Sequence, residues 1–161
     1  MDFSNILDPS EFSKFTHYSS VSNLDKTFDT KRKYDVKTDF VPDGMFFAIG
    51  SAWIDWTIRE RFRCAEYRYR YTIHSSSFKK LNILKIDDIK YYKKIDNDDL
   101  YGLDWGDYYG HYDGVYITQK ILDQRWDFSV LSSINIAIGH LDIPQMIVWN
   151  VRNLKLVRCL L

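Results

Sequence analysis

AEYRYRYTIH, residues 65–74, is the stretch of the chain that most clearly decides the fold. Every second position carries Ala, Tyr or Ile, and the positions between them carry Glu, Arg, Thr or His. Successive side chains of a strand point to opposite faces of a sheet, and aromatic and β-branched residues favour strands. The stretch therefore predicts a strand with one face in the core and one polar face.

Further strand signals lie on both sides of this stretch. Short alternating or apolar runs of this length, bounded by Gly, Asp or Asn, are typical of strands. Helix signals are fewer, and the clearest of them follows Ser51, which is expected to act as an N-cap. The predicted strands are residues 14–19, 44–49, 81–86, 115–118, 145–150 and 154–159, the last two as a hairpin. The predicted helices are residues 52–62, 87–94 and one segment within 97–112.

Strands thus outnumber helices, and many of the connections are short. This pattern predicts an α+β fold with a mostly antiparallel, aromatic-rich sheet, either continuous or split, and a few short helices. A chain of 161 residues has the usual length of one domain, and no linker or repeat divides it, so we expect a single domain over residues 1–161.

Composition excludes some classes of partner. Lys plus Arg and Asp plus Glu both number 22, so no global field attracts nucleic acid or an anionic membrane. No apolar run is long enough to span a bilayer, and residues 1–5 (MDFSN) lack the features of a signal peptide. We therefore expect a soluble protein with no membrane partner, located in a host or microbial cytoplasm or associated with a virion.

The aromatic content is high, with 5 Trp, 12 Tyr and 10 Phe. Such rings fill a core or form a surface on which ligands stack, and the core is the more frequent use. The sequence motifs of phosphate-binding loops, dinucleotide-binding folds, zinc proteases and serine hydrolases are missing from the sequence. The four His have no metal-ligand spacing, so no metal is expected. The five Asp of residues 97–113 fit caps and turns better than a Ca²⁺ loop.

Two groups of polar residues are candidates for ligand binding. His17 is followed by Tyr18 and two Ser, and a histidine beside hydroxyls can bind a sugar or be satisfied within the fold. Arg68 and Arg70 share one strand face, where they can hold a phosphate or pair with neighbouring acids. For both groups the residues alone favour the structural role.

Three segments of the first half resemble the ADP-ribosyltransferase superfamily, in its histidine-containing branch: residues 15–20 (FTHYSS), 44–48 (GMFFA) and 53–56 (WIDW). Residues 112–117 (YDGVYI) and 149–150 (WN) are similar to segments of small viral and phage-like proteins with this layout. The resemblance covers about residues 14–117. It implies NAD as substrate, loss of nicotinamide through an oxocarbenium-like state, and attack by a protein or nucleic-acid acceptor.

The resemblance also implies roles for individual residues. His17 would hydrogen-bond the nicotinamide ribose or the carboxamide region, assisted by Ser19 or Ser20, and Phe47 or Tyr18 would stack on the nicotinamide ring. The cleft would be lined by His17, Phe47, Ser51 and the region of Tyr116.

The chain departs from the superfamily at one position. The superfamily places a Glu on a late core strand, whereas the three Glu of this chain are Glu11, Glu60 and Glu66. Near the expected place lie Asp113, Tyr116 and Gln119, and a Gln can hydrogen-bond a ribose but cannot act as a general base. One hypothesis is therefore a transferase in which Asp113 replaces the Glu, with His17 and Gln119 as the other catalytic residues.

Three further hypotheses stay open. The first is a catalytically inactive relative that binds a nucleotide or a protein, which the missing Glu favours. The second is a structural or interaction protein, such as a virion or viral accessory component, whose partner surface would be formed by Trp105, Tyr108, Tyr109 and Trp126. The third is a nucleic-acid-binding module, which the zero net charge disfavours.

Overall fold

The computed structural model describes residues 5–22, 24, 44–61, 67–91, 93–95, 100–102, 105–124 and 142–161. Several of the residues considered above lie outside these ranges: Glu66, Asp98, Asp99, Asp104, Trp126 and His140. The described part of the chain contains one seven-stranded sheet and a separate two-stranded sheet.

The large sheet has the strand order β4-β7-β8-β2-β1-β3-β9, and its neighbours are antiparallel except for the parallel pair β4–β7. This confirms the predicted α+β class with a mostly antiparallel sheet. Its strands are β1 (Phe15–Ser19), β2 (Met45–Ile49), β3 (Tyr69–Ile73), β4 (Ile83–Ile86), β7 (Gly114–Ile117), β8 (Gln145–Val148) and β9 (Leu156–Leu160). The small sheet pairs β5 (Lys93–Ile95) with β6 (Leu100–Gly102).

The helices are short. The α-helices are α1 (Ala52–Arg59), α2 (Trp105–Tyr109) and α3 (Gln119–Gln124). Segments of 3₁₀ helix occur at η2 (Pro9–Lys14), η3 (Ser75–Ser77), η4 (Ile89–Tyr91) and η5 (Val151–Asn153). In the part of the chain that the structure describes, none of the helices combines the length and the apolar character needed to cross a membrane.

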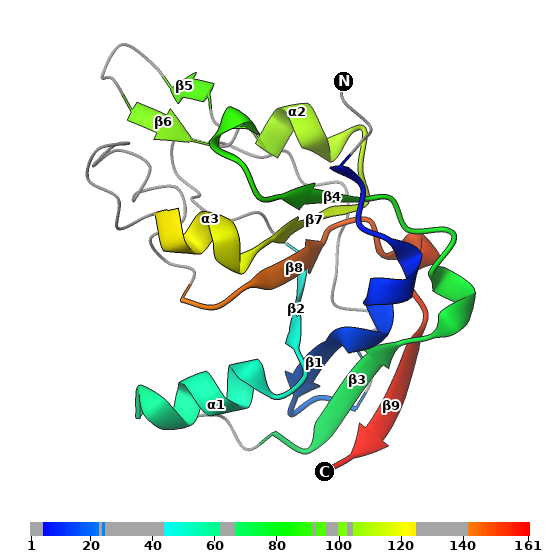
Figure 1. Cartoon of the computed structure of the whole chain (residues 1–161). Coiled ribbons are helices and arrows are strands. Elements are labelled where there is room, and N and C mark those ends of the chain that lie inside the picture. Colours follow the sequence, from blue (N-terminus) through cyan, green and yellow to red (C-terminus); the bar gives the residue numbers. More distant parts are fainter. Residues whose placement is uncertain are drawn as a thin grey trace.

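The large sheet is strongly bent. Figure 1 shows β4, β7 and β8 as one group and β1, β3 and β9 as another, with β2 between them. The ring of Phe15 on β1 meets the ring of Tyr116 on β7 edge to face, with centroids 5.0 Å apart, although β8 and β2 separate these strands in the sheet. The two halves of the sheet therefore face each other across a shared core.

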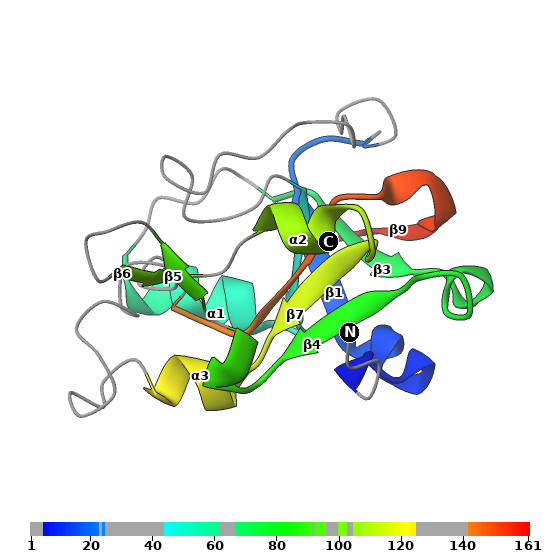
Figure 2. The same cartoon turned by 90° about the horizontal axis from the view of Figure 1, so that it is seen from above.

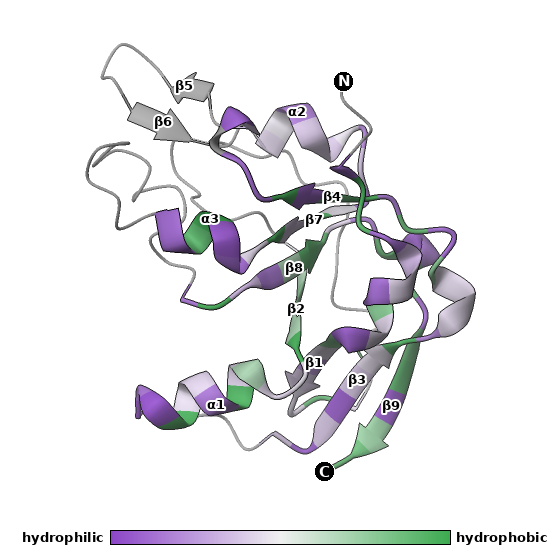
Figure 3. Ribbon diagram, in the orientation of Figure 1, coloured by the Kyte–Doolittle hydropathy of each residue, from purple (hydrophilic) through white to green (hydrophobic). Residues whose placement is uncertain are grey.

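Strands β4, β7 and β8 are buried on both faces. Along β7, Val115 and Ile117 belong to a cluster that also includes residues of α2 and α3, whereas Tyr116 belongs to a second cluster with Phe15 and Tyr71. Figure 2 shows β4 and β7 running side by side, and Figure 3 shows the hydrophobic character of these strands. Burial on both faces explains why β7 and β8 are mainly apolar rather than alternating, whereas β4 includes the partly buried Lys85.

The sequence predictions were wrong about one strand pairing and one helix. Strands β8 and β9 do not form a hairpin: β8 lies between β7 and β2, and β9 pairs with β3 at the far edge. The bend of the sheet separates them, and the η5 turn, where the Asn150 side chain accepts a hydrogen bond from the Arg152 amide, redirects the chain. Residues 87–94 are not one helix, because Asp88 caps only the η4 turn before β5 begins. Gln119 follows β7 and is the first residue of α3.

Trp105 is likewise not a surface residue. It is 1% exposed and packs in the cluster that covers the outer face of β7 and β8, against Tyr108. Tyr108 and Tyr109 are partly buried against the same cluster, and the Tyr109 ring stacks on Trp149 with centroids 5.3 Å apart. The aromatic residues around α2 thus mainly build the core.

Candidate functional site

A cavity opens where β1 and β2 separate. The two strands pair at only two positions, Phe15 with Ile49 and Thr16 with Ala48. Beyond Thr16, β1 continues its pairing with β3, and β2 continues its pairing with β8. The cavity between them has a volume of about 520 Å³, within the range of small-molecule sites.

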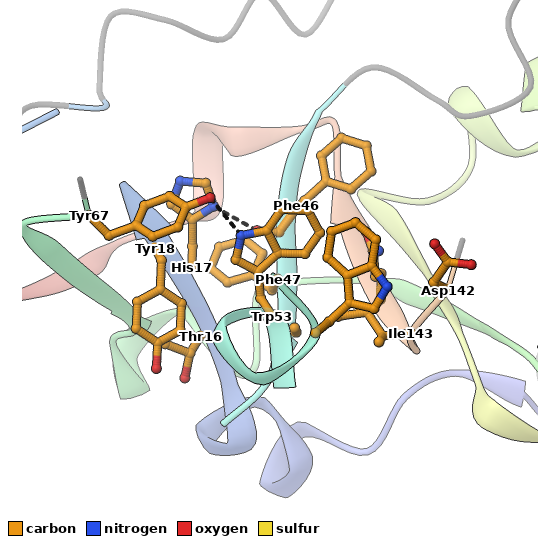
Figure 4. A pocket seen from close by; sticks show the side chains of 12 residues that line it. Thr16, His17, Tyr18, Phe46, Phe47, Trp53, Tyr67, Asp142 and Ile143 are labelled. Atoms are coloured by element: carbon orange, nitrogen blue, oxygen red, sulfur yellow. Dashed lines mark hydrogen bonds between the residues drawn. The ribbon is translucent and has the colours of Figure 1, made fainter. Parts of the chain in front are cut away.

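The cavity is lined mainly by aromatic side chains (Figure 4). The lining residues come from the two separating strands, from the helix that follows β2, from the segment just before β3, and from the start of β8 with the residues just before it. The lining residues are Thr16, His17, Tyr18, Phe46, Phe47, Ala48, Trp53, Trp56, Tyr67, Asp142, Ile143 and Gln145.

His17 lies at the point of separation with a fixed tautomer. Its Nδ1 atom is 2.7 Å from the carbonyl oxygen of Phe46. Since a carbonyl oxygen only accepts, Nδ1 carries the proton and donates, so Nε2 of the neutral ring is an acceptor. Burial lowers the pKa of His17 below its ordinary 6.5, and the bond to the Phe46 carbonyl opposes this only in part. At neutral pH the cavity therefore holds an uncharged imidazole with an acceptor nitrogen.

The aromatic walls are held by contacts between their own members. Trp53 and Trp56 lie three positions apart on α1, which places them on the same helix face, and their rings stack with centroids 5.0 Å apart. The indole Nε1 of Trp53 donates to the hydroxyl of Tyr67 at 2.8 Å. The ring of Tyr67 packs against the ring of Tyr18, with centroids 6.2 Å apart. The helix, β1 and the start of β3 are thereby joined around the cavity.

Charge is distributed unevenly around the cavity. Among the twelve lining residues of the described structure, Asp142 supplies a carboxylate and none is Lys or Arg. Arg70 is exposed and lies directly opposite Tyr18 in the β1–β3 register. Directly opposite residues place their Cβ atoms about 5 Å apart on the same face. A cationic side chain therefore stands beside Tyr18 without lining the cavity.

The structure brings three of the residues expected at the site together: His17, Tyr18 and Phe47. The rings of His17 and Phe47 are in contact, with centroids 5.9 Å apart. Phe47 is 1% exposed, which means that most of its surface is already used in the core. Of the two rings expected to stack on a ligand, Tyr18 is the better exposed.

The three serines expected at the site and Tyr116 lie outside the cavity lining. The hydroxyl oxygen of Ser19 accepts a hydrogen bond from the Val21 amide, and Ser20 follows it at the exposed end of β1. Ser51 precedes α1, but its hydroxyl donates to Asp55 instead of accepting from a helix amide, so the expected N-cap bond is missing. Tyr116 is 8% exposed in the core, where burial and the nearby Glu11 raise the pKa of its phenol.

Asp113 connects three strands instead of facing the cavity. One carboxylate oxygen accepts from the backbone amide of Asn82 before β4 at 2.8 Å, and the other accepts from the side-chain amide of Asn150 after β8 at 2.6 Å. The backbone oxygen of Asp113 also accepts from the amides of Trp149 and Asn150. These contacts give Asp113 a structural role in the described fold.

Gln119 is engaged on α3. Its side-chain amide donates to the carboxylate of Asp123, one helical turn further on, at 2.7 Å, and both residues are exposed. The late-strand residue that lines the cavity is instead Gln145 on β8, which is 8% exposed and pairs with Ala48.

Sequence reasoning missed nine of the twelve lining residues, among them Trp53, Trp56, Tyr67, Asp142 and Gln145. The three-residue spacing of the two Trp on a predicted helix could have indicated them, and the alternation of residues 65–74 places Tyr67 on the aromatic face. Asp142 and Gln145 carry no local signal, because the pairing of β8 with β2 is what brings them to the cavity.

Comparisons with protein-family models, with curated proteins and with solved structures find no match for this chain. Within the described ranges, no group of three or more His, Cys, Asp or Glu is arranged to hold a metal ion. The functional argument therefore depends on the geometry and chemistry of the cavity itself.

We expect Asp113→Ala to destabilise the fold without changing ligand binding at the cavity. The substitution leaves the Asn82 amide and the Asn150 side chain without their acceptor, and such losses cost about 1–3 kcal/mol each. Urea unfolding should show a decrease of roughly 2–4 kcal/mol in the free energy of unfolding. Asp123→Ala, at an exposed site on α3, is the control and should change stability by less than about 0.5 kcal/mol. Unchanged stability in Asp113→Ala would contradict its structural role.

The lowered pKa of His17 predicts a pH dependence of stability. Below pH 6.5 the unfolded chain binds a proton at His17 more readily than the folded protein does. The free energy of unfolding should therefore be at its full value above pH 6.5 and decline as the pH falls towards the lowered pKa. In His17→Asn, whose amide can still donate to the Phe46 carbonyl, this part of the decline should disappear. Identical pH profiles of the two proteins in urea unfolding would count against a buried neutral His17.

Proposed function

We propose that this protein binds NAD in the cavity between β1 and β2, as a domain of ADP-ribosyltransferase type. The observation that carries the proposal is the position of His17. This histidine, on the first strand of the sheet, lines an aromatic cavity, and the hydrogen bond of its Nδ1 to the Phe46 carbonyl leaves Nε2 as the acceptor nitrogen. A hydroxyl of the nicotinamide ribose would donate to Nε2, since a ribose hydroxyl is a donor that such a nitrogen can accept from.

The cavity suits the nicotinamide half of the molecule. A volume of about 520 Å³ accommodates a ring and a ribose, and the rest of the dinucleotide would extend outwards. Aromatic rings attract one another in stacked or edge-to-face arrangements, so the nicotinamide ring would lie against Tyr18 or the Trp pair. Arg70, opposite Tyr18, is placed to pair with a phosphate group that leaves the cavity on that side.

Transfer of ADP-ribose would require a group that takes the acceptor's proton. Gln145, the residue of a late strand that lines the cavity, can hydrogen-bond a ribose but cannot accept a proton. Asp113 has both carboxylate oxygens engaged between strands. We therefore propose NAD binding as the function and expect nicotinamide to be released slowly or not at all.

The orientation of the ligand is tested by saturation-transfer NMR. Irradiation of protein methyl groups in the presence of NAD should transfer magnetisation more strongly to the nicotinamide ring protons than to the adenine protons. Ser51→Ala, an exposed position outside the cavity lining, should give the same pattern. Transfer to the adenine protons alone, or to neither ring, would contradict the proposal.

A further inference from the structure

Two buried polar side chains of the cavity lining have no hydrogen-bond partner in the described part of the chain. Six Ser, Thr and Gln residues are buried there. Four of them bond through their hydroxyls to backbone groups: Ser19, Thr57, Ser77 and Thr118. The two that remain, Thr16 and Gln145, are 6% and 8% exposed, and both line the cavity. Buried polar groups are almost always hydrogen-bonded, so two exceptions at one cavity indicate that these groups serve a ligand.

These two side chains stand on either side of a small residue. Thr16 of β1 pairs with Ala48 of β2, and Ala48 pairs with Gln145 of β8. Directly opposite residues of antiparallel strands project to the same face of a sheet, so the three residues form one row. Thr16 and Ala48 are also the last pair before β1 and β2 separate, and all three residues line the cavity. This part of the cavity wall therefore has a methyl group between a hydroxyl and an amide.

The spacing of the row suits a flat ring. Neighbouring strands lie about 4.8 Å apart, which puts about 10 Å between the backbones of β1 and β8 at this point. A six-membered ring that lies over the methyl group of Ala48 fits between the Thr16 hydroxyl and the Gln145 amide. Phe46 lies two positions before Ala48 on β2, and hence on the same face, where it adds an aromatic contact.

The side chain of Gln145 offers a donor next to an acceptor. Its amide carries an NH₂ group and a carbonyl oxygen on the same carbon. A primary amide of a ligand presents the same two groups and engages both at once, whereas a hydroxyl engages only one. A carboxylate has acceptors only, so one of its oxygens would face the carbonyl oxygen of Gln145. Its charge would also leave water for a lining in which none of the twelve described residues is Lys or Arg.

From this arrangement we infer that Gln145 is a specificity-determining residue, which recognises the carboxamide of a flat ring bound over Ala48. The cavity thus selects a ring with a primary amide over the same ring with a ketone or a carboxylate. The inference rests on the proposed function, because it concerns the nicotinamide ring of NAD in the same cavity. The hydroxyl of Thr16, next to His17 on β1, then lies on the side of the ribose.

Three dinucleotides that differ only in the ring substituent test the inference on the wild-type protein. NAD carries a carboxamide, its 3-acetylpyridine analogue carries a methyl ketone, and nicotinic acid adenine dinucleotide carries a carboxylate. Each is titrated into the protein by calorimetry at neutral pH. NAD is expected to bind at least about fivefold more tightly than the ketone, because the ketone leaves the carbonyl oxygen of Gln145 without a donor. The carboxylate is expected to bind more weakly still.

Variants assign this discrimination to Gln145. Gln145→Met keeps the length of the side chain and removes both polar groups, so NAD and the ketone should bind with equal affinity. Gln119→Met, the same substitution at an exposed position of α3 outside the lining, should keep the wild-type ratio of affinities. Thr16→Val should weaken both ligands by the same factor and leave their ratio unchanged. Equal affinities of the wild-type protein for NAD and the ketone, or a wild-type ratio in Gln145→Met, would overturn the inference.

The outcomes separate this inference from the proposed function. Binding of NAD and its ketone analogue with equal affinity would support the NAD site and overturn amide recognition. Failure of all three dinucleotides to bind would overturn the NAD site, and free nicotinamide and free nicotinate are then titrated in their place. Binding of nicotinamide alone, lost in Gln145→Met, would support amide recognition without an NAD site, and binding of neither would overturn both proposals.

Discussion

Replacing Gly114 by Ala should lower the free energy of unfolding by at least about 3 kcal/mol, the range of severe overpacking. A Cβ atom at this position would lie 2.2 Å from the carbonyl oxygen of Ile147 and 2.9 Å from Cα of Val148. Both are backbone atoms of β8, with which β7 pairs through Gly114 and Val148. Since no side chain can simply turn away, the two strands must move apart, and both clusters of the core are disturbed.

Gly110→Ala is the matched control for this prediction. The added Cβ would meet no atom within 4 Å, so the change in stability should stay within about 1 kcal/mol. Urea unfolding of the two variants and the wild type provides the comparison. Equal free energies of unfolding for the two variants would contradict the close contact between β7 and β8 on which the fold depends.

His17→Ala should reduce the affinity for NAD at least about tenfold while leaving the protein folded. The substitution removes the acceptor Nε2 and the ring that contacts Phe47, and a lost hydrogen bond to a buried partner costs about 1–3 kcal/mol. The Phe46 carbonyl also loses its donor, so stability should fall by about 1 kcal/mol. Calorimetry with NAD gives the affinity, and circular dichroism verifies that the fold is retained.

Two variants identify the atom that matters at this position. His17→Gln can place an amide oxygen near the position of Nε2 and should recover part of the affinity. His74→Ala is the control, because this histidine is exposed and its imidazole bonds to Ser76 in the adjoining turn, away from the cavity lining. An unchanged affinity of His17→Ala for NAD would show that His17 does not contribute to binding. Loss of the fold would show that its role is structural.

Much of the fold could be predicted from the sequence because its signals are local. The alternation around Tyr71 and the apolar run at Phe46 each specify a strand without reference to the rest of the chain. The choice of partner strands for β8 and for β9 is not local. It depends on the bend of the sheet, which brings Phe15 and Tyr116 into contact. A hairpin was therefore the wrong expectation for these two strands, which are neighbours in the sequence but not in the sheet.

The same distinction applies to the candidate site. His17, Tyr18 and Phe47 were predicted from a resemblance in short segments, and the structure places all three at the cavity. Asp113 was considered because of its position in the sequence, yet its carboxylate bonds between strands. Asp142 reaches the cavity only through the insertion of β8 between β7 and β2, which no local pattern encodes.

We propose that the cavity between β1 and β2 is a binding site for NAD. The most direct test of this proposal is a calorimetric titration of the wild-type protein with NAD, followed in parallel by an assay for released nicotinamide. We predict saturable binding at a single site with a Kd below about 1 mM, and little or no nicotinamide release. No binding heat at millimolar NAD would contradict an NAD site in this cavity, and rapid release of nicotinamide would contradict a binding function without transfer.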